Sequence, residues 1–166
     1  TASSFSSFSK NNLIDSLEKI LPAKTGKEKF NVLGELAYQY CFVNTDKALE
    51  YGNAELKVAA EMGDSLMIAQ AWNDLGAAYV SRGELEKSIQ FTSIALRVRE
   101  KYGDSLLVAN SLNKIGYAYL NMGVLEKSLT AFVRAASIYD QQKNFQYLGI
   151  TYNNMGSVFL RQGNID

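Results

Sequence analysis

Histidine is absent from the sequence, and this absence excludes more chemistry than any other feature of the composition. Without an imidazole the chain lacks the usual acid–base group near neutral pH, the Ser-His and Cys-His nucleophile pairs, and the commonest zinc ligand. We also find no glycine-rich phosphate loop and no metal-spaced cluster of side chains. The sequence therefore predicts no enzyme activity, no catalytic residue, no metal site and no cofactor.

An excess of charge of one sign is also missing, because 17 Lys and Arg residues balance 17 Asp and Glu residues. A nucleic-acid-binding domain usually carries a basic face, so we expect no nucleic acid as a partner of this region. No run of about eighteen apolar residues occurs, so we expect neither a membrane span nor membrane contact. The chain starts at Thr1 without a methionine or a signal peptide, and we interpret it as a piece of a longer protein.

Cysteine and proline each occur once. Cys41 cannot form a disulfide within the chain, and its apolar neighbours indicate a packing residue. Secreted and cytosolic locations both remain open on this ground. No proline follows Pro22, a pattern that favours uninterrupted helices over most of the chain.

What the sequence contains in abundance is repetition. The segment Trp72-Asn73-Asp74-Leu75-Gly76 has counterparts at residues 112–116 and 152–156. The same interval of about forty residues separates the turn glycines Gly83, Gly123 and Gly163. A period in this range is typical of an array of small units that bury surface only against each other.

Apolar residues at helical spacing predict an all-α chain of helix–turn–helix units. We expect residues 1–10 to be a flexible tail or linker, residues 11–24 an N-terminal capping helix, and residues 25–166 the repeat array. The helices expected within the array cover residues 27–42, 46–62, 65–82, 84–102, 104–122 and 124–142, with a last one from 145 to the turn at Gly163. We expect the fourth repeat to be incomplete, because the sequence stops where its second helix should begin.

Glycines inside the first helix of each unit predict close helix packing. A glycine in a helix interior costs about 1 kcal/mol against alanine, so a compensating contact is expected. These glycines are Gly76, Gly116 and Gly156.

Glu55 occupies a packing column in which the later repeats have Ala95 and Ala135. A carboxylate at such a position would have a raised pKa unless it were paired. We therefore expect this helix end to be rotated so that Glu55 is partly exposed to water.

Taken together, the columns resemble the tetratricopeptide repeat family over residues 27–166. The pattern reads Trp72, Leu75-Gly76, Tyr79, Ser88 and Ala95 in one unit, and Leu112, Ile115-Gly116, Tyr119, Ser128 and Ala135 in the next. The period of about forty exceeds the family's commoner 34, and the usual boundary proline is missing. The resemblance implies a right-handed α-α superhelix of about 3.5 repeats plus the capping helix, with the first helix of each pair on the concave side.

An asparagine column is the candidate functional feature of that side. Asn73, Asn113 and Asn153 recur in phase, although asparagine is a poor helix-interior residue. An Asn amide can hold both the C=O and the N–H of an extended peptide, so the column could bind a peptide backbone. In the alternative interpretation the asparagines hydrogen-bond between neighbouring helices and fix the register of the stack. Further candidates for this groove are Gln70, Asn110, Tyr117, Asn121, Ser157 and Arg161.

Two functions follow from these patterns. The first is a protein or peptide-binding scaffold, and the segments Asp15–Lys19 and Asp46–Tyr51 look similar to the N-terminal repeat arrays of Bacteroidetes-type histidine kinases and transcriptional regulators. That resemblance implies the sensor region of a larger signalling protein and favours a periplasmic location, with a cytoplasmic one as the alternative. The second is structural self-assembly or an adaptor role, in which an uncovered apolar face near residues 145–166 forms a homodimer.

Overall fold

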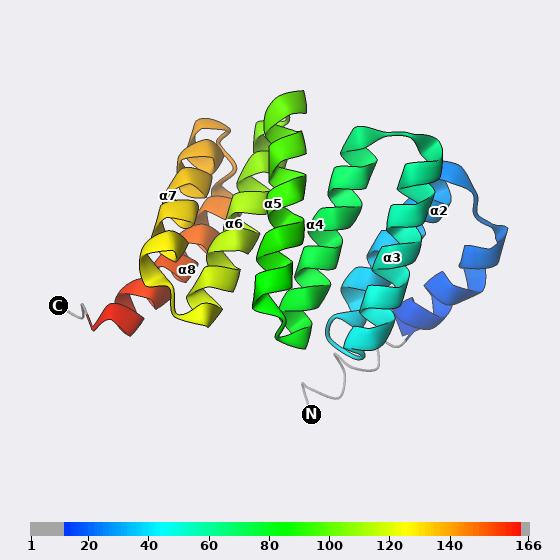
Figure 1. The fold of residues 1–166 in the computed structure, drawn as a ribbon, viewed down its shortest axis with the longest axis horizontal. Coiled ribbons are helices and arrows are strands. Elements are labelled where there is room, and N and C mark those ends of the chain that lie inside the picture. The colour runs from blue at the N-terminus through cyan, green and yellow to red at the C-terminus, as the bar shows by residue number, and fades with distance from the viewer. Residues whose placement is uncertain (1–11, 164–166) are drawn as a thin grey trace.

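Helices account for all the regular structure that the computed structural model describes, over residues 12–163 (Figure 1). The expected tail at residues 1–10 lies outside the described residues. A helix over residues 12–20 leads into a short 3₁₀ turn, η1 (Leu21–Ala23), which contains Pro22. The array follows as α2 (Gly26–Tyr40), α3 (Thr45–Met62), α4 (Ser65–Arg82), α5 (Leu85–Tyr102), α6 (Ser105–Met122), α7 (Leu125–Gln141) and α8 (Phe145–Gln162). These bounds agree with the sequence expectations to within about two residues.

Local sequence signals set the helix boundaries. The carboxylate of Asp64 accepts hydrogen bonds from the backbone N–H groups of Leu66 and Met67 at 2.9 and 3.0 Å, which caps α4. Asn44 caps α3 in the same way. The glycines that end α3, α4, α5, α6 and α8 all have left-handed backbone angles, which glycine adopts without steric cost: Gly63, Gly83, Gly103, Gly123 and Gly163. The turn glycines Gly83, Gly123 and Gly163 thus end the first helices of their pairs, as their recurrence predicted.

The helices form two layers, and the spacing within each layer curves the array. Each helix packs against the next one in the chain. Among the first helices of the pairs, α2 also contacts α4, α4 contacts α6, and α6 contacts α8, whereas within residues 12–163 no such contact joins α3 to α5 or α5 to α7. The layer of α2, α4, α6 and α8 is therefore the inner side of the curve, and α3, α5 and α7 form the outer side.

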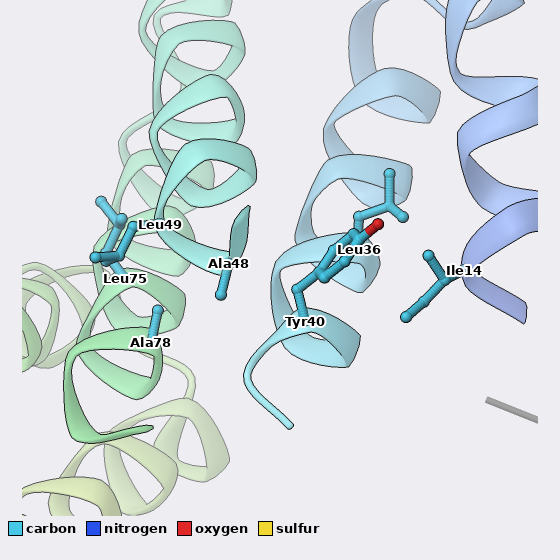
Figure 2. Packing of buried hydrophobic residues seen from close by; sticks show 7 residues of the cluster. All are labelled: Ile14, Leu36, Tyr40, Ala48, Leu49, Leu75 and Ala78. Carbon is cyan, nitrogen blue, oxygen red and sulfur yellow. The ribbon is translucent and has the colours of Figure 1, made fainter. Parts of the chain in front are cut away.

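The apolar core is a series of clusters along the array, as expected for stacked units that bury surface only against their neighbours. In one cluster Leu36 and Tyr40 of α2 pack against Ala48 and Leu49 of α3 (Figure 2). The helix over residues 12–20 contributes Ile14, and α4 contributes Leu75 and Ala78 to the same cluster. The molecule is an all-α helical-repeat superhelix. No helix within the described residues is long and apolar enough to cross a membrane.

The glycines inside the helices confirm close packing at two positions and differ at the third. A Cβ on Gly76 would collide with Oγ1 of Thr92, and one on Gly116 would lie 2.7 Å from the Phe132 ring. A Cβ on Gly156 would meet nothing within 4 Å. The packing explanation is therefore wrong for Gly156 in this structure, because no described helix covers that side of α8.

Candidate ligand-binding groove

The inner side of the array is a polar surface crossed by hydrogen bonds from one first helix to the next. We call the surface of α2, α4, α6 and α8 the groove. Lys114 Nζ on α6 donates to the backbone oxygen of Asn73 on α4 at 3.2 Å and lies 3.4 Å from Asp74 Oδ1. Arg161 Nη1 on α8 donates to the backbone oxygen of Leu120 on α6 at 2.6 Å. These bonds hold neighbouring repeats in register.

The asparagines of the column become more exposed along the groove from α4 to α8. Asn73 is only 1% exposed; its Nδ2 donates to Asn110 Oδ1 at 3.4 Å, and its Oδ1 accepts from Ser111 Oγ at 3.3 Å. Both polar atoms of the Asn73 amide are therefore engaged within the protein, and neither is available to a peptide in this conformation. The alternative interpretation, a bond between neighbouring helices, describes Asn73.

The next two members of the column are progressively more accessible. Asn113 is half-buried, and its Oδ1 accepts from Thr151 Oγ1 at 3.4 Å and from Asn154 Nδ2 at 3.5 Å, both on α8. Asn153 is exposed on α8. The asparagine of this column is thus hydrogen-bonded in each repeat whose first helix is covered by the first helix of the next repeat.

The remaining candidates fall into two groups. Gln70 joins the cluster around Asn73, because its Nε2 donates to Asp74 Oδ2 at 2.6 Å. Tyr117, with 44% of its surface exposed, and Asn121 are open to solvent on α6. Ser157 is half-buried, and its hydroxyl donates to the backbone oxygen of Asn153 at 3.2 Å. The structure thus joins Gln70, Asn73 and Asn110 in one network and leaves Tyr117, Asn121 and Asn153 accessible.

Arg99 belongs to this network, and the sequence reasoning missed it. It is 1% exposed within α5, where its guanidinium donates to Gln70 Oε1 at 2.5 Å, Ser111 Oγ at 2.8 Å and the backbone oxygen of Leu107 at 3.2 Å. Burial lowers the pKa of Arg99, while the negative charge of Asp74 acts in the opposite direction. A signal was present, since Arg99 stands where the neighbouring repeats bury Ala59 and Tyr139.

The expectation that Glu55 is partly exposed to water was wrong. Glu55 is 1% exposed and not partly wet, and its Oε2 has no hydrogen-bond partner. The reason is Gly34: a Cβ at that position would lie 2.7 Å from Glu55 Oε1, so the missing side chain leaves the space that the carboxyl group fills. Gly34 occupies the asparagine column of the first repeat, where the next repeat has Asn73.

Glu55 lines a cavity of about 360 Å³ at the groove, between α2, α3 and α4. This volume is near the small end of the range for small-molecule sites. Glu35 and Tyr38 contribute from α2, and Asp74 from α4. Burial raises the pKa of Glu55 to about 9, the negative charge of Asp74 adds to the rise, and Lys114 opposes it. Within residues 12–163 no group of three His, Cys, Asp or Glu side chains is placed to hold a metal ion.

Comparison with known families identifies the repeat. Residues 67–141 match the tetratricopeptide repeat family. These residues carry tetratricopeptide repeats. The comparison with curated proteins gave no match.

Solved tetratricopeptide-like structures share the arrangement. A Rap protein complexed with Competence and Sporulation Factor matches with a TM-score of 0.82 at 17% identity, over 96% of this chain and 47% of that one. BtubC (BKLC) from P. vanneervenii gives 0.70 at 23% identity, over 81% and 57%. A putative kinesin light chain from Podosopora anserina gives 0.72 at 15% identity, over 93% and 79%. At these identities the likeness shows the fold alone, and this chain spans only about half of the first two proteins.

Proposed function

We propose that the groove binds an extended segment of a partner protein or a peptide, and that this region is the sensor or interaction part of a larger bacterial signalling protein. The tetratricopeptide fold supports a protein-interaction scaffold. The single observation that carries the finer proposal is the unengaged polar surface on α6 and α8. There Tyr117, Asn121 and Asn153 are exposed on the inner side of the curve.

The chemistry of these side chains suits an extended chain. An Asn amide offers a donor pair and an acceptor to a peptide backbone, and Tyr adds contact area at low entropic cost. The buried cluster around Asn73 and Arg99 serves a different purpose, since it fixes the relative placement of α4, α5 and α6. A groove held in a defined shape loses less entropy when it binds.

Two solved relatives fit this proposal. The Rap structure contains a protein complexed with Competence and Sporulation Factor. A signal transduction ATPase from Pyrococcus horikoshii is described as having a tetratricopeptide repeat sensor. These statements concern those proteins; for this chain they support a regulatory binding role as a proposal.

The test is a binding measurement with an equimolar pool of blocked, random-sequence hexapeptides, followed by NMR of the ¹⁵N-labelled full chain. We expect amide shifts concentrated on α6 and α8. The double variant Tyr117→Ala/Asn153→Ala should weaken binding by more than about tenfold while its melting temperature holds. Val133→Ala, a substitution of another exposed residue on the outer helix α7, is the matched control. Unchanged affinity in the double variant would contradict the proposal.

A second candidate function is self-assembly through α8. Large apolar side chains are exposed on this helix, among them Phe145 at 68% and Leu160 at 62%. Such patches tend to mark interaction sites. Sedimentation velocity should then show a concentration-dependent dimer that Leu160→Glu abolishes, and a strict monomer up to about 1 mM would exclude this candidate, since a weaker dimer would be worth less than about 4 kcal/mol.

A further inference from the structure

The cavity beside Glu55 contains a polar atom that the protein leaves without a partner. Glu55 Oε2 is buried and accepts no hydrogen bond, while the residue lines a space of about 360 Å³. A buried carboxyl oxygen without a partner costs free energy, and native structures avoid this cost at most positions. This buried, unpartnered oxygen belongs to a side chain that lines a cavity, so a ligand group in the cavity could supply the missing bond.

The backbone of α2 is shaped to let this carboxyl group reach the cavity. The three atoms nearest to a Cβ placed on Gly34 belong to the Glu55 side chain, at 2.7, 3.1 and 3.5 Å. The nearest contact of Gly34 is therefore the end of a flexible side chain, in contrast with Gly76, whose Cβ would meet Thr92 and the backbone of Ser88. Gly34 and Glu55 are complementary. Gly34 has no side chain on the inner helix α2, and the Glu55 carboxyl group of the outer helix α3 fills that space.

The charge of the cavity is one-sided. Glu35, Glu55 and Asp74 line it, and among residues 12–163 no Lys or Arg does. The carboxylate of Glu35 accepts a hydrogen bond from Gln39 Nε2 at 2.7 Å. Gln39 is neutral, so this bond does not cancel the negative charge of Glu35. Lys114 is the cation that approaches, and it is already engaged with Asp74 and with the backbone of Asn73. The carboxylates of Glu35 and Asp74 thus create a negative potential at the groove that a cation would neutralise.

We propose that this cavity receives a lysine or arginine side chain of the partner bound in the groove, with Glu55 Oε2 as its buried ion-pair acceptor and Glu35 and Asp74 at the entrance. The inference rests on the proposed function, since the cation belongs to the bound peptide or protein. Phe30 and Tyr38 in the wall give the apolar stem of such a side chain a surface to pack on.

Binding of the cation is coupled to loss of a proton. With the cavity empty, burial and the neighbouring Asp74 raise the pKa of Glu55 to about 9, so the group is neutral at pH 7. Glu35, Asp74, Tyr38 and Lys114 are the titratable groups that share this environment. An incoming cation pairs with the ionised form and displaces the proton, so affinity should rise with pH up to about 9.

The experiment uses single blocked amino acids as probes of the cavity. Nα-acetyl-lysine N-methylamide, its arginine counterpart and its norleucine counterpart are titrated into the ¹⁵N-labelled full chain and followed by NMR. We expect the lysine or arginine probe to shift the amides of Gly34 and Glu55 and to bind at least about tenfold more tightly than norleucine, which has the stem without the charge. Equal binding of norleucine would overturn the proposal.

Variants identify the acceptor. Glu55→Gln keeps the size and removes the charge, and we expect it to lose the tenfold preference; Gly34→Ala should lose it as well, because its Cβ displaces the carboxyl group. Glu50→Gln, at an exposed position of the same helix, is the control and should retain the preference. Calorimetry in two buffers at pH 7.5 should show release of nearly one proton by the wild type and none by Glu55→Gln. An unchanged preference in Glu55→Gln would contradict the assignment.

Two further arms separate this inference from the proposed function. If hexapeptides bind the groove but pools with a fixed Lys or Arg bind no better than a norleucine pool, the cavity assignment fails and the groove function stands. If the lysine probe binds but no hexapeptide does, the cavity assignment survives as a cation site and the groove function fails.

Spermidine tests a free polyamine as the source of the cation. Tighter binding of spermidine than of every Lys-containing pool would overturn the assignment to a partner side chain.

Discussion

The first and second repeats share one architecture but place their polar groups differently. In the second repeat, Asn73 and Arg99 lie inside a network of hydrogen bonds that joins α4, α5 and α6. In the first repeat, Gly34 replaces the asparagine, and Glu55 fills the gap with an oxygen that has no partner. The repeat fixes where a side chain lies, but the neighbouring residues decide whether its polar atoms find partners within the protein.

The largest expected effect tests the closed network of the second repeat. Arg99→Ala removes a buried stem and leaves the partners Gln70 and Ser111 without their donor. We expect it to lower the free energy of unfolding by about 3–5 kcal/mol in a urea titration. Arg99→Met keeps most of the volume and should cost less than half as much. Equal losses in the two variants would show that the lost hydrogen bonds of the guanidinium group, and not packing of the stem, dominate at this position.

The helix glycines give a second contrast between the same repeats. Gly76→Ala forces a Cβ against Thr92 and the Ser88 backbone, so we expect a loss of about 1–3 kcal/mol of unfolding free energy. In Gly34→Ala the atoms nearest to the new Cβ belong to the flexible end of Glu55, so this variant should cost less. Gly156→Ala serves as the control, because it faces open space and should gain about 0.5–1 kcal/mol from helix propensity. Equal effects at Gly76 and Gly34 would remove the distinction between a packing glycine and a glycine that accommodates a carboxyl group.

The first repeat should also make stability depend on pH, through the buried carboxyl group of Glu55. Because the pKa of Glu55 is raised from 4.5 to about 9 on folding, the folded state holds this proton more tightly than the unfolded state. Its contribution to stability is fully present below about pH 4.5 and is lost as the pH rises to about 9. Glu55→Gln removes this loss, so relative to wild type it should gain about 1–3 kcal/mol at pH 9 and little at pH 4.5. A gain that is independent of pH would indicate that Glu55 does not titrate in this window.

The smallest effect concerns the two ends of the asparagine column. Asn73→Ala should cost about 1–2 kcal/mol in urea unfolding, because it leaves Asn110 and Ser111 without their bonds. Asn153→Ala lies at an exposed position and should stay within about 0.5 kcal/mol of wild type. If Asn153→Ala were as damaging as Asn73→Ala, exposure would not separate the two roles.

Local signals allowed most of the fold to be predicted. Asp64 caps a helix through its own backbone neighbours, and Gly83 ends one because glycine alone adopts the left-handed angles freely. Such interactions span a few residues, so the sequence displays them directly. The recurrence of the whole unit then indicates the superhelix.

The candidate site was predictable only in part, because its chemistry depends on contacts between columns. Asn73 was identified from its periodicity, but its burial depends on how closely α6 packs on α4. The expectation for Glu55 failed because Gly34, 21 residues earlier in the chain, provides the space for its carboxyl group. Arg99 differs from the residues at the equivalent position of the neighbouring repeats, Ala59 and Tyr139. Such departures from the repeat indicate the site better than the repeated residues do.

The central claim is that the first repeat holds an unpartnered, protonated carboxyl group at the groove, where the second repeat holds a closed network. A carboxyl ¹³C NMR titration of Glu55 tests it most directly, with Glu50 on the same helix as the internal reference. We predict that Glu55 keeps the chemical shift of a neutral acid at pH 7 and titrates near pH 9, as its raised pKa of about 9 requires. A midpoint near the ordinary value of 4.5 would contradict the account.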